Sequence, residues 1–266
     1  MKIYLVSLEG DYGRRNLLKE NFTSYYKNFI YEPAVWGKSL KSSQYFKYSL
    51  SFYNKHKQLI TPNEVGCTLS HLNVLKNFLT SNAEYALILE DDVVGYDEDI
   101  ESVLKYFERK CDLKGLFILG GQDGLNYEKY ILGREINQNI IQNNVYSIAK
   151  FSSKFIFRTC CYVVNRELAK YIIEYHKLNF SRADCWFDIL KDTNFPLTYM
   201  NIFKHPVDLS NSHIEKERNF SAEPNFIKRI LKQGLFWKIR NRILNDYNLY
   251  KLLILGYKQI LKEREK

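Results

Sequence analysis

Short, continuous apolar runs separated by longer amphipathic stretches dominate the first 203 residues of the chain. Runs of this length, without regular alternation of polar and apolar positions, are typical of strands that a sheet buries on both faces. The predicted strands cover residues 3–8, 29–35, 85–89, 115–120, 155–164 and 197–203. The pattern therefore predicts a central sheet that is covered by other elements on both sides.

The amphipathic stretches between these runs predict the covering helices. The clearest begins at Thr61, which can cap a helix with a proline at its first position, and Glu64 completes a capping box. Its leucines continue to about residue 80; other helices are predicted over residues 14–25 and from Asn165 to about residue 176. Residues 37–57 show no clean period and are predicted to be an irregular insert. Strands that alternate with helices predict an α/β fold with a mainly parallel central sheet.

The charge of the chain is concentrated in its C-terminal part. Residues 225–266 carry eleven Lys and Arg and three acidic residues, a net charge of +8, whereas residues 1–224 have a net charge of +1. Apolar residues recur every three or four positions in the basic part, which predicts an amphipathic helical tail after an α/β domain of residues 1–224. Such a tail suits an anionic membrane surface, or it docks on the body as ordinary helices. The strong apolar seam disfavours nucleic acid as the partner.

Composition excludes several classes of protein. With 266 residues, 45% hydrophobic and 26% charged, the chain is not disordered. No apolar run approaches the roughly 20 residues of a membrane span. The run over residues 3–8 is too short for the core of a signal peptide, so we expect a cytoplasmic chain that begins at Met1. The five cysteines form no CxxC pair, which indicates reduced thiols and no zinc knuckle.

The most informative polar feature is the run Glu90, Asp91 and Asp92, directly after a predicted buried strand. Ligands in open α/β sheets collect at the carboxyl ends of the strands. Three adjacent carboxylates repel one another unless a cation lies among them, and oxygen ligands suit Mg²⁺ or Mn²⁺. The alternative is an acidic turn that only begins the next helix.

Further polar residues are candidates for catalysis. Asp184 and Asp188 lie four residues apart at a predicted helix start, where either can supply a general base; Asp184 can equally be a helix cap. Arg14 follows the first strand and suits a phosphate, or it is simply solvated. His71 lies off the leucine stripe of its helix and can be catalytic or structural.

Gly120 and Gly121 follow another predicted strand, where they let backbone approach a ligand or form an ordinary turn. The sequence contains no GxGxxG, GxxxxGK[ST], HExxH or GxSxG motif. The sequence therefore lacks the motifs that would indicate a dehydrogenase, a P-loop protein, a zinc protease or an α/β-hydrolase.

Taken together, these segments resemble glycosyltransferase family 25, the lipooligosaccharide and lipopolysaccharide galactosyltransferases. The most specific matches are Gly-Cys-x-Leu-Ser-His ending at His71 and Leu-Glu-Asp-Asp-Val ending at Val93. Segments 5–8 and 31–37 also match, and segments 161–165, 183–184 and 206–214 match more weakly. The similarity extends in the family's order over about residues 2–219.

The resemblance implies a GT-A-like fold and an inverting transfer, usually of galactose from UDP-galactose onto a lipid-linked oligosaccharide at the cytoplasmic face of the bacterial inner membrane. It implies a Mn²⁺ or Mg²⁺ ion on Asp92 with Asp91 or Glu90, and Asp184 as the base, with Asp188 second. The donor would contact Ser7, Leu8, Arg14, Ser70, His71, Glu90, Asp91, Gly120 and Gly121.

Other functions remain open from the sequence. The donor can be UDP-glucose, a UDP-N-acetylhexosamine or a nucleotide sugar with another base. In different classes, the chain can be a metal-dependent phosphodiesterase that binds nucleic acid through its tail, or a non-enzymatic adaptor at the membrane surface. The intact carboxylate run at its strand end argues against an adaptor with a decayed sugar site.

Overall fold

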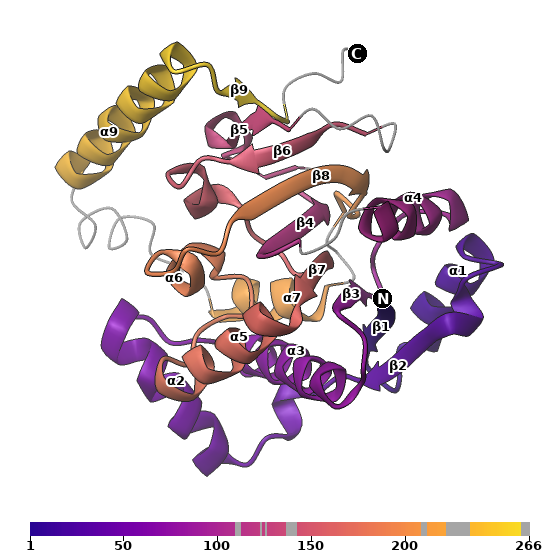
Figure 1. The fold of residues 1–266 in the computed structure, drawn as a ribbon. Coiled ribbons are helices and arrows are strands. Elements are labelled where there is room, and N and C mark those ends of the chain that lie inside the picture. The colour runs from indigo at the N-terminus through magenta and orange to yellow at the C-terminus, as the bar shows by residue number, and fades with distance from the viewer. Residues whose placement is uncertain are drawn as a thin grey trace.

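The computed structural model describes residues 1–109, 113–122, 124–125, 127–136, 143–208, 212–221 and 235–261. Within these residues, nine strands form one sheet in the order β2-β1-β3-β7-β4-β8-β6-β5-β9 (Figure 1). The strands are β1 Lys2–Ser7, β2 Phe29–Pro33, β3 Tyr85–Glu90, β4 Leu116–Gly120, β5 Leu132–Glu135, β6 Val145–Ile148, β7 Cys161–Asn165, β8 Leu197–Phe203 and β9 Lys258–Gln259.

The sheet is mixed. Strand β1 pairs parallel with β2 and β3, and β4 pairs parallel with β8. Strand β7 lies antiparallel between β3 and β4, and β6, β5 and β9 continue the sheet with antiparallel pairs. The α/β class is confirmed, but the prediction of a mainly parallel sheet is wrong for the strand pairings. Apolar runs report burial on both faces and carry no information on strand direction.

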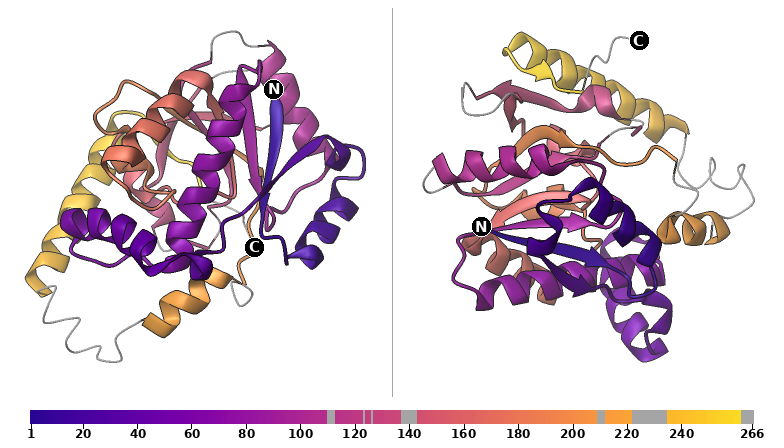
Figure 2. Two further views of the ribbon diagram at one scale, coloured as in Figure 1. Left: turned by 90° about the horizontal axis from the view of Figure 1, so that it is seen from below. Right: turned by 90° about the vertical axis from the view of Figure 1, so that its right-hand side faces the viewer.

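Helices cover the two faces of the sheet, as Figure 2 shows from two sides. Alternate residues of the central strands point to opposite faces. Tyr4 and Ile88 belong to a core with α3 and α5, whereas Leu5 and Leu89 belong to a second core with α1 and α4. The helices are α1 Tyr12–Asn21, α2 Ser42–His56, α3 Pro62–Thr80, α4 Asp97–Arg109, α5 Arg166–Leu178, α6 Trp186–Leu190, α7 His213–Ser221 and α9 Leu235–Ile254.

The predicted helix starts are confirmed where a cap defines them. The Thr61 hydroxyl accepts a hydrogen bond from Glu64 N, and Glu64 Oε2 accepts one from Thr61 N, so α3 begins with a complete capping box. The Asn165 side chain likewise accepts from Leu168 N at the start of α5. These starts depend only on local sequence.

Two predictions from the hydrophobic pattern are wrong. Helix α2 occupies most of the segment predicted to be irregular; it buries little besides Ser49 and Phe52, so its apolar period is weak. The strand predicted over residues 155–164 begins only at Cys161, because Arg158 has a left-handed backbone (φ 65°) that interrupts the extended chain.

The C-terminal part is helical over α9, as predicted, but then forms strand β9 on the edge of the sheet. Leu249 on α9 is buried against the core that contains α3 and α5. Residues 225–234 and 262–266 of the predicted tail lie outside the described residues.

Candidate active site

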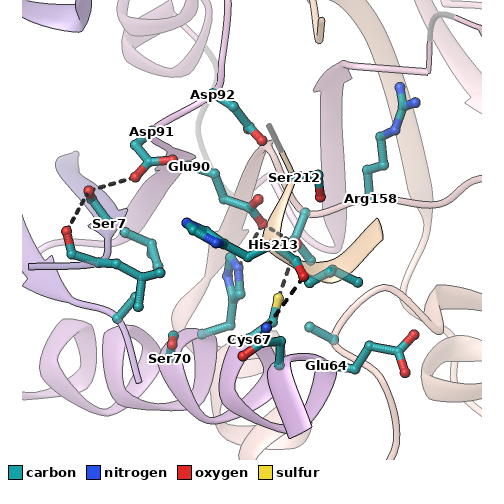
Figure 3. A pocket seen from close by; sticks show the side chains of 18 of the residues that line it. Ser7, Glu64, Cys67, Ser70, Glu90, Asp91, Asp92, Arg158, Ser212 and His213 are labelled. Carbon is teal, nitrogen blue, oxygen red and sulfur yellow. Dashed lines mark hydrogen bonds and ion pairs between the residues drawn. The ribbon is translucent and has the colours of Figure 1, made fainter. Parts of the chain in front are cut away.

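A pocket lies where several strands end at one edge of the sheet (Figure 3). Strands β1, β2, β3 and β8 contribute residues that follow their carboxyl ends, and antiparallel β7 contributes residues that precede it. The lining includes seven residues predicted to bind the donor, namely Ser7, Leu8, Arg14, Ser70, His71, Glu90 and Asp91, together with Asp92 and Asp184. The topology therefore brings together most of the predicted site.

The three adjacent carboxylates face different parts of the pocket, although Asp91 and Asp92 both form an ion pair with Arg14. Glu90 contacts His71 and Thr159, Asp91 contacts residues of β1 and α1, and Asp92 faces the segment after β8. Figure 3 shows Asp91 turned toward Ser7 and Glu90 turned toward α3. The run therefore connects three parts of the pocket, and its members do not meet at one common point.

Both oxygens of Asp91 are occupied by protein donors. Ser7 Oγ donates to Oδ2 at 2.6 Å and Arg14 Nη1 donates to Oδ1 at 2.8 Å. Burial raises the pKa of Asp91 to about 6, although both hydrogen bonds lower it. Arg15 holds Ser7 from the other side, with Nη1 donating to Ser7 Oγ at 2.8 Å. Asp91 thus orders the first loop and positions Arg14.

Asp92 is better placed than its neighbours to hold a cation. Its Oδ1 is buried and has no hydrogen-bond partner among the described residues, and its Oδ2 lies 3.5 Å from His205 Nε2. Burial alone would raise its pKa, but His205 and Arg14 lower it overall. A bridge between Val94 and Lys204 joins the chain after β3 to the chain after β8, which fixes this pairing.

His205 has the orientation of a metal-binding histidine. Its Nδ1 lies 2.8 Å from the carbonyl of Pro206, so Nδ1 carries the proton and Nε2 faces Asp92. A backbone carbonyl that fixes the tautomer in this way is the usual outer partner of a metal-ligating imidazole. The orphaned Asp92 oxygen and His205 Nε2 therefore fit a divalent cation.

His71 and Glu90 form a second polar cluster at the floor of the pocket. His71 Nε2 lies 3.0 Å from Glu90 Oε1, and His71 Nδ1 lies 2.9 Å from the Tyr162 hydroxyl. Ligand atoms of Cys67, His71 and Glu90 all lie within 4.8 Å of one another. Sulfur with nitrogen suits zinc more than magnesium. Burial raises the pKa of the Cys67 thiol, which keeps the sulfur protonated.

Asp184 faces the pocket, whereas Asp188 does not line it. Asp184 Oδ2 accepts a hydrogen bond from Arg158 N at 3.2 Å, and Trp186 Nε1 donates to Arg158 O at 3.1 Å, so both hold the left-handed turn. Asp188 instead forms ion pairs with Lys55 and Lys191, at 3.3 and 3.2 Å. These pairs lower its pKa although burial would raise it.

Gly120 and Gly121 support the site from behind and do not line the pocket. A Cβ on Gly120 would lie 1.9 Å from Phe203 O, and one on Gly121 would lie 2.1 Å from Cys160 Sγ. The Gly121 carbonyl accepts from Arg158 Nη1 at 2.7 Å. Their contribution to the site is therefore close packing and the position of Arg158.

Helix α7 forms one wall of the pocket. Arg218 donates to Glu64 Oε1 through Nη2 at 2.6 Å and Nε at 3.0 Å. Asn63 N donates to Glu217 Oε2 at 2.9 Å, and the His213 ring lies edge-on to Trp36. Glu64 thus caps α3 and also anchors α7.

Sequence reasoning missed several lining residues, among them His205, Thr159, Arg158, Trp36 and Arg218. The position of His205 directly after a predicted strand was a usable signal, because ligands collect at such ends. The others depend on contacts between distant segments, and no local motif marks them.

The four cysteines in the described residues are free, and Cys111 lies outside them. Within the described part of the chain, no helix combines the length and hydropathy needed to cross a membrane.

The fold is a mixed α/β sheet with a polar pocket at one edge, and sequence comparison specifies the family. A sequence model described as glycosyltransferase family 25 (LPS biosynthesis protein) matches residues 1–186. The chain belongs to glycosyltransferase family 25, as its motifs predicted. Membership of this family supports the prediction that the chain is a transferase.

The individual proteins that match this chain are distant relatives, with identities below 30%. A glycosyltransferase 25 family member of Aedes aegypti is 25% identical over 211 residues, covering 76% of this chain and 33% of the relative. Procollagen galactosyltransferase 1-B of Xenopus laevis is 29% identical over 97 residues, covering 35% and 16%. The lipooligosaccharide biosynthesis protein lex-1 of Haemophilus influenzae is 27% identical over 126 residues, covering 46% and 40%. The matches thus span less than half of each relative.

Proposed function

We propose that this chain is an inverting glycosyltransferase that moves a hexose from a nucleotide sugar onto a sugar of a lipooligosaccharide or lipopolysaccharide acceptor. The observation that carries the proposal is one pocket in which Arg14, Arg158, the Asp92–His205 pair and Asp184 are gathered at the carboxyl edge of the sheet. Guanidinium groups suit a diphosphate, and a carboxylate suits the proton of an acceptor hydroxyl.

The favoured donor is UDP-galactose, with UDP-glucose or a UDP-N-acetylhexosamine as alternatives. The names of two relatives support this choice: one is a procollagen galactosyltransferase and another is a lipooligosaccharide biosynthesis protein. The second name also supports a lipooligosaccharide acceptor. The proposed location is a peripheral position at the cytoplasmic face of a bacterial inner membrane.

The chemistry requires a base and a stabilised leaving group. The acceptor oxygen bonds to the anomeric carbon, the bond from that carbon to the phosphate oxygen breaks, and the hydroxyl proton passes to a carboxylate. Asp184 is the proposed base, because it lines the pocket that Asp188 does not line. Arg14 and Arg158 would pair with the departing diphosphate.

A Mn²⁺ or Mg²⁺ ion would be held by Asp92 Oδ1, which has no hydrogen-bond partner among the described residues, and by His205 Nε2, which faces Asp92. When bound, such an ion neutralises charge on the diphosphate. Asp91 and Glu90 would act indirectly, through Arg14 and His71 respectively.

Thermal denaturation with UDP-galactose, UDP-glucose and UDP-N-acetylglucosamine, each with and without Mn²⁺, tests this proposal. A ligand at a hundredfold excess over Kd stabilises the folded state by about 2.7 kcal/mol. We expect one UDP-sugar to raise the Tm in a Mn²⁺-dependent way, and Asp92→Asn to remove the Mn²⁺ dependence.

Asp188→Asn is the matched control and should retain the full shift, because Asp188 does not line the pocket. Absence of a shift with every nucleotide sugar in the folded wild-type protein would overturn the proposal. An equal shift without Mn²⁺ would overturn the metal assignment alone.

A further inference from the structure

Helix α9 exposes an apolar stripe on the side that faces away from the protein. Five residues at spacings of four, four, three and four lie on this side: Ile239, Ile243, Tyr247, Tyr250 and Ile254, with exposed fractions of 49, 62, 62, 65 and 86%. Such spacing places side chains on one face of a helix. Helices of soluble proteins normally turn this face toward the core, so the arrangement in α9 is inverted.

Contacts away from the stripe and at its edge fix the orientation of the helix. Leu249 is buried, and Asp246 Oδ1 accepts hydrogen bonds from the Tyr130 hydroxyl at 2.7 Å and from Lys129 Nζ at 3.1 Å. After the helix, Arg134 Nη2 donates to Leu255 O at 2.9 Å, and β9 pairs with β5. Figure 1 shows α9 along the margin of the molecule beside these strands. The docked face therefore holds the stripe outward.

Basic residues flank the stripe on both sides. At about 100° per residue, Arg240 and Lys251 follow one margin of the stripe, and Arg242 lies beyond the other margin. All three are exposed. The acidic residue of α9, Asp246, is turned toward Lys129. The outward face of the helix thus combines apolar side chains with positive charge.

We propose that this outward face of α9 is a membrane-binding surface for anionic lipid. The isoleucines would enter the boundary between headgroups and acyl chains, the tyrosines would lie at the headgroup level, and the basic residues would pair with lipid phosphates. A second copy of the chain is disfavoured as the occupant, since it would bring two rows of like charge together. The proposal names the surface that would give the peripheral membrane position proposed above and rests on that position, but it does not depend on sugar transfer.

Co-sedimentation of the full chain with vesicles tests the proposal without any nucleotide sugar. The vesicles are phosphatidylethanolamine with phosphatidylglycerol at 3:1, or phosphatidylcholine alone, at low and high NaCl. We expect the wild-type protein to bind the anionic vesicles at low salt. Binding should be at least tenfold weaker at high salt, and at least tenfold weaker to vesicles of pure phosphatidylcholine. The double variants I243S/Y250S and R240E/K251E should each weaken binding at least tenfold.

Matched controls separate the stripe from general surface properties. Leu178, 80% exposed on α5, is replaced by serine, and the exposed Lys170 is replaced by glutamate. Both variants should bind as the wild type does, and circular dichroism should show unchanged folding in all variants. Equal binding by the α9 variants and the wild type would overturn the proposal. The proposal would also be overturned if the wild-type protein did not bind vesicles but formed a concentration-dependent dimer, and if I243S/Y250S abolished that dimer.

Discussion

His71 Nε2 and Glu90 Oε1 lie 3.0 Å apart, and this contact joins the two most specific sequence motifs of the chain. One motif is on α3 and the other ends β3. The Tyr162 hydroxyl completes the cluster from β7, 2.9 Å from His71 Nδ1, and burial raises its pKa. The contact fixes the direction in which Glu90 enters the pocket.

Replacing His71 should lower the free energy of unfolding by more than the contribution of its own hydrogen bonds, because the groups it pairs with are left behind. In His71→Leu, the buried Tyr162 hydroxyl and Glu90 both lose a partner, and each such loss costs about 1–3 kcal/mol. The two losses together should lower the free energy of unfolding, measured in urea at pH 7, by about 2–6 kcal/mol.

A double-mutant cycle with Glu90→Gln isolates the contact. Groups that touch in one network show coupling energies of about 0.5–3 kcal/mol. We expect a value in this range, and effects that simply add would show that the two side chains act independently.

The two candidate bases should separate cleanly. Asp184→Asn keeps an oxygen that can accept from Arg158 N, so the turn should remain, but an amide cannot take the acceptor proton. Loss of a general base typically lowers the rate about 10²–10⁴-fold. We expect kcat for transfer to fall by that factor, while the UDP-sugar still raises the Tm.

Asp188→Asn serves as the comparison and should change kcat less than twofold. Its ion pairs with Lys55 and Lys191 would weaken, which lowers the Tm slightly. The reverse pattern, with transfer lost in Asp188→Asn and kept in Asp184→Asn, would reassign the base.

Close approach of α3 to the chain after β2 predicts a steric effect at Gly66. A Cβ there would lie 2.4 Å from Val35 O and 2.8 Å from Gly37 N. The same loop is tied to α3 by Val35 N, which donates to Ser70 Oγ at 2.8 Å. We expect Gly66→Ala to lower the free energy of unfolding by about 1–3 kcal/mol, as overpacking does.

Gly13→Ala is the control, because Gly13 is also helical and has nothing within 4 Å of an added Cβ. It should stabilise the protein by less than the roughly 0.5–1 kcal/mol found in helix interiors, because Gly13 is the second residue of α1. Stabilisation of similar size at Gly66 would contradict the close contact in the structure.

Features that depend on local chemistry were predictable from the sequence. The capping box at Thr61 and Glu64 defined the start of α3, and the apolar run before Glu90 defined β3. The alternative that the acidic run only begins a helix also had local support, yet α4 starts later, at Asp97. Resemblance to family motifs then placed His71 and Glu90 in one site.

Features that depend on distant segments were not predictable from one sequence. His205 faces Asp92 because the segment after β8 bridges to the segment after β3 at Val94 and Lys204. The antiparallel insertion of β7 is equally invisible in an apolar run, although it brings Thr159 to Glu90. Each of these pairings depends on strand order, which hydrophobic periodicity does not encode.

The buried His176 predicts a loss of stability in mild acid. Burial lowers its pKa to about 4, and its Nδ1 accepts a hydrogen bond from Ser181 N at 3.4 Å. In the unfolded chain the pKa of histidine is about 6.5, so between these values the unfolded state binds a proton that the native state does not. Stability from this group is therefore fully present above pH 6.5 and falls as the pH is lowered toward 4.

At pH 5 the loss of stability due to His176 should be about 2 kcal/mol relative to pH 7. His176→Gln keeps an acceptor for Ser181 N and removes the titration, so urea unfolding at pH 7 and pH 5 should show a correspondingly smaller difference. A variant that loses as much stability as the wild type over this range would show that other groups cause the acid sensitivity.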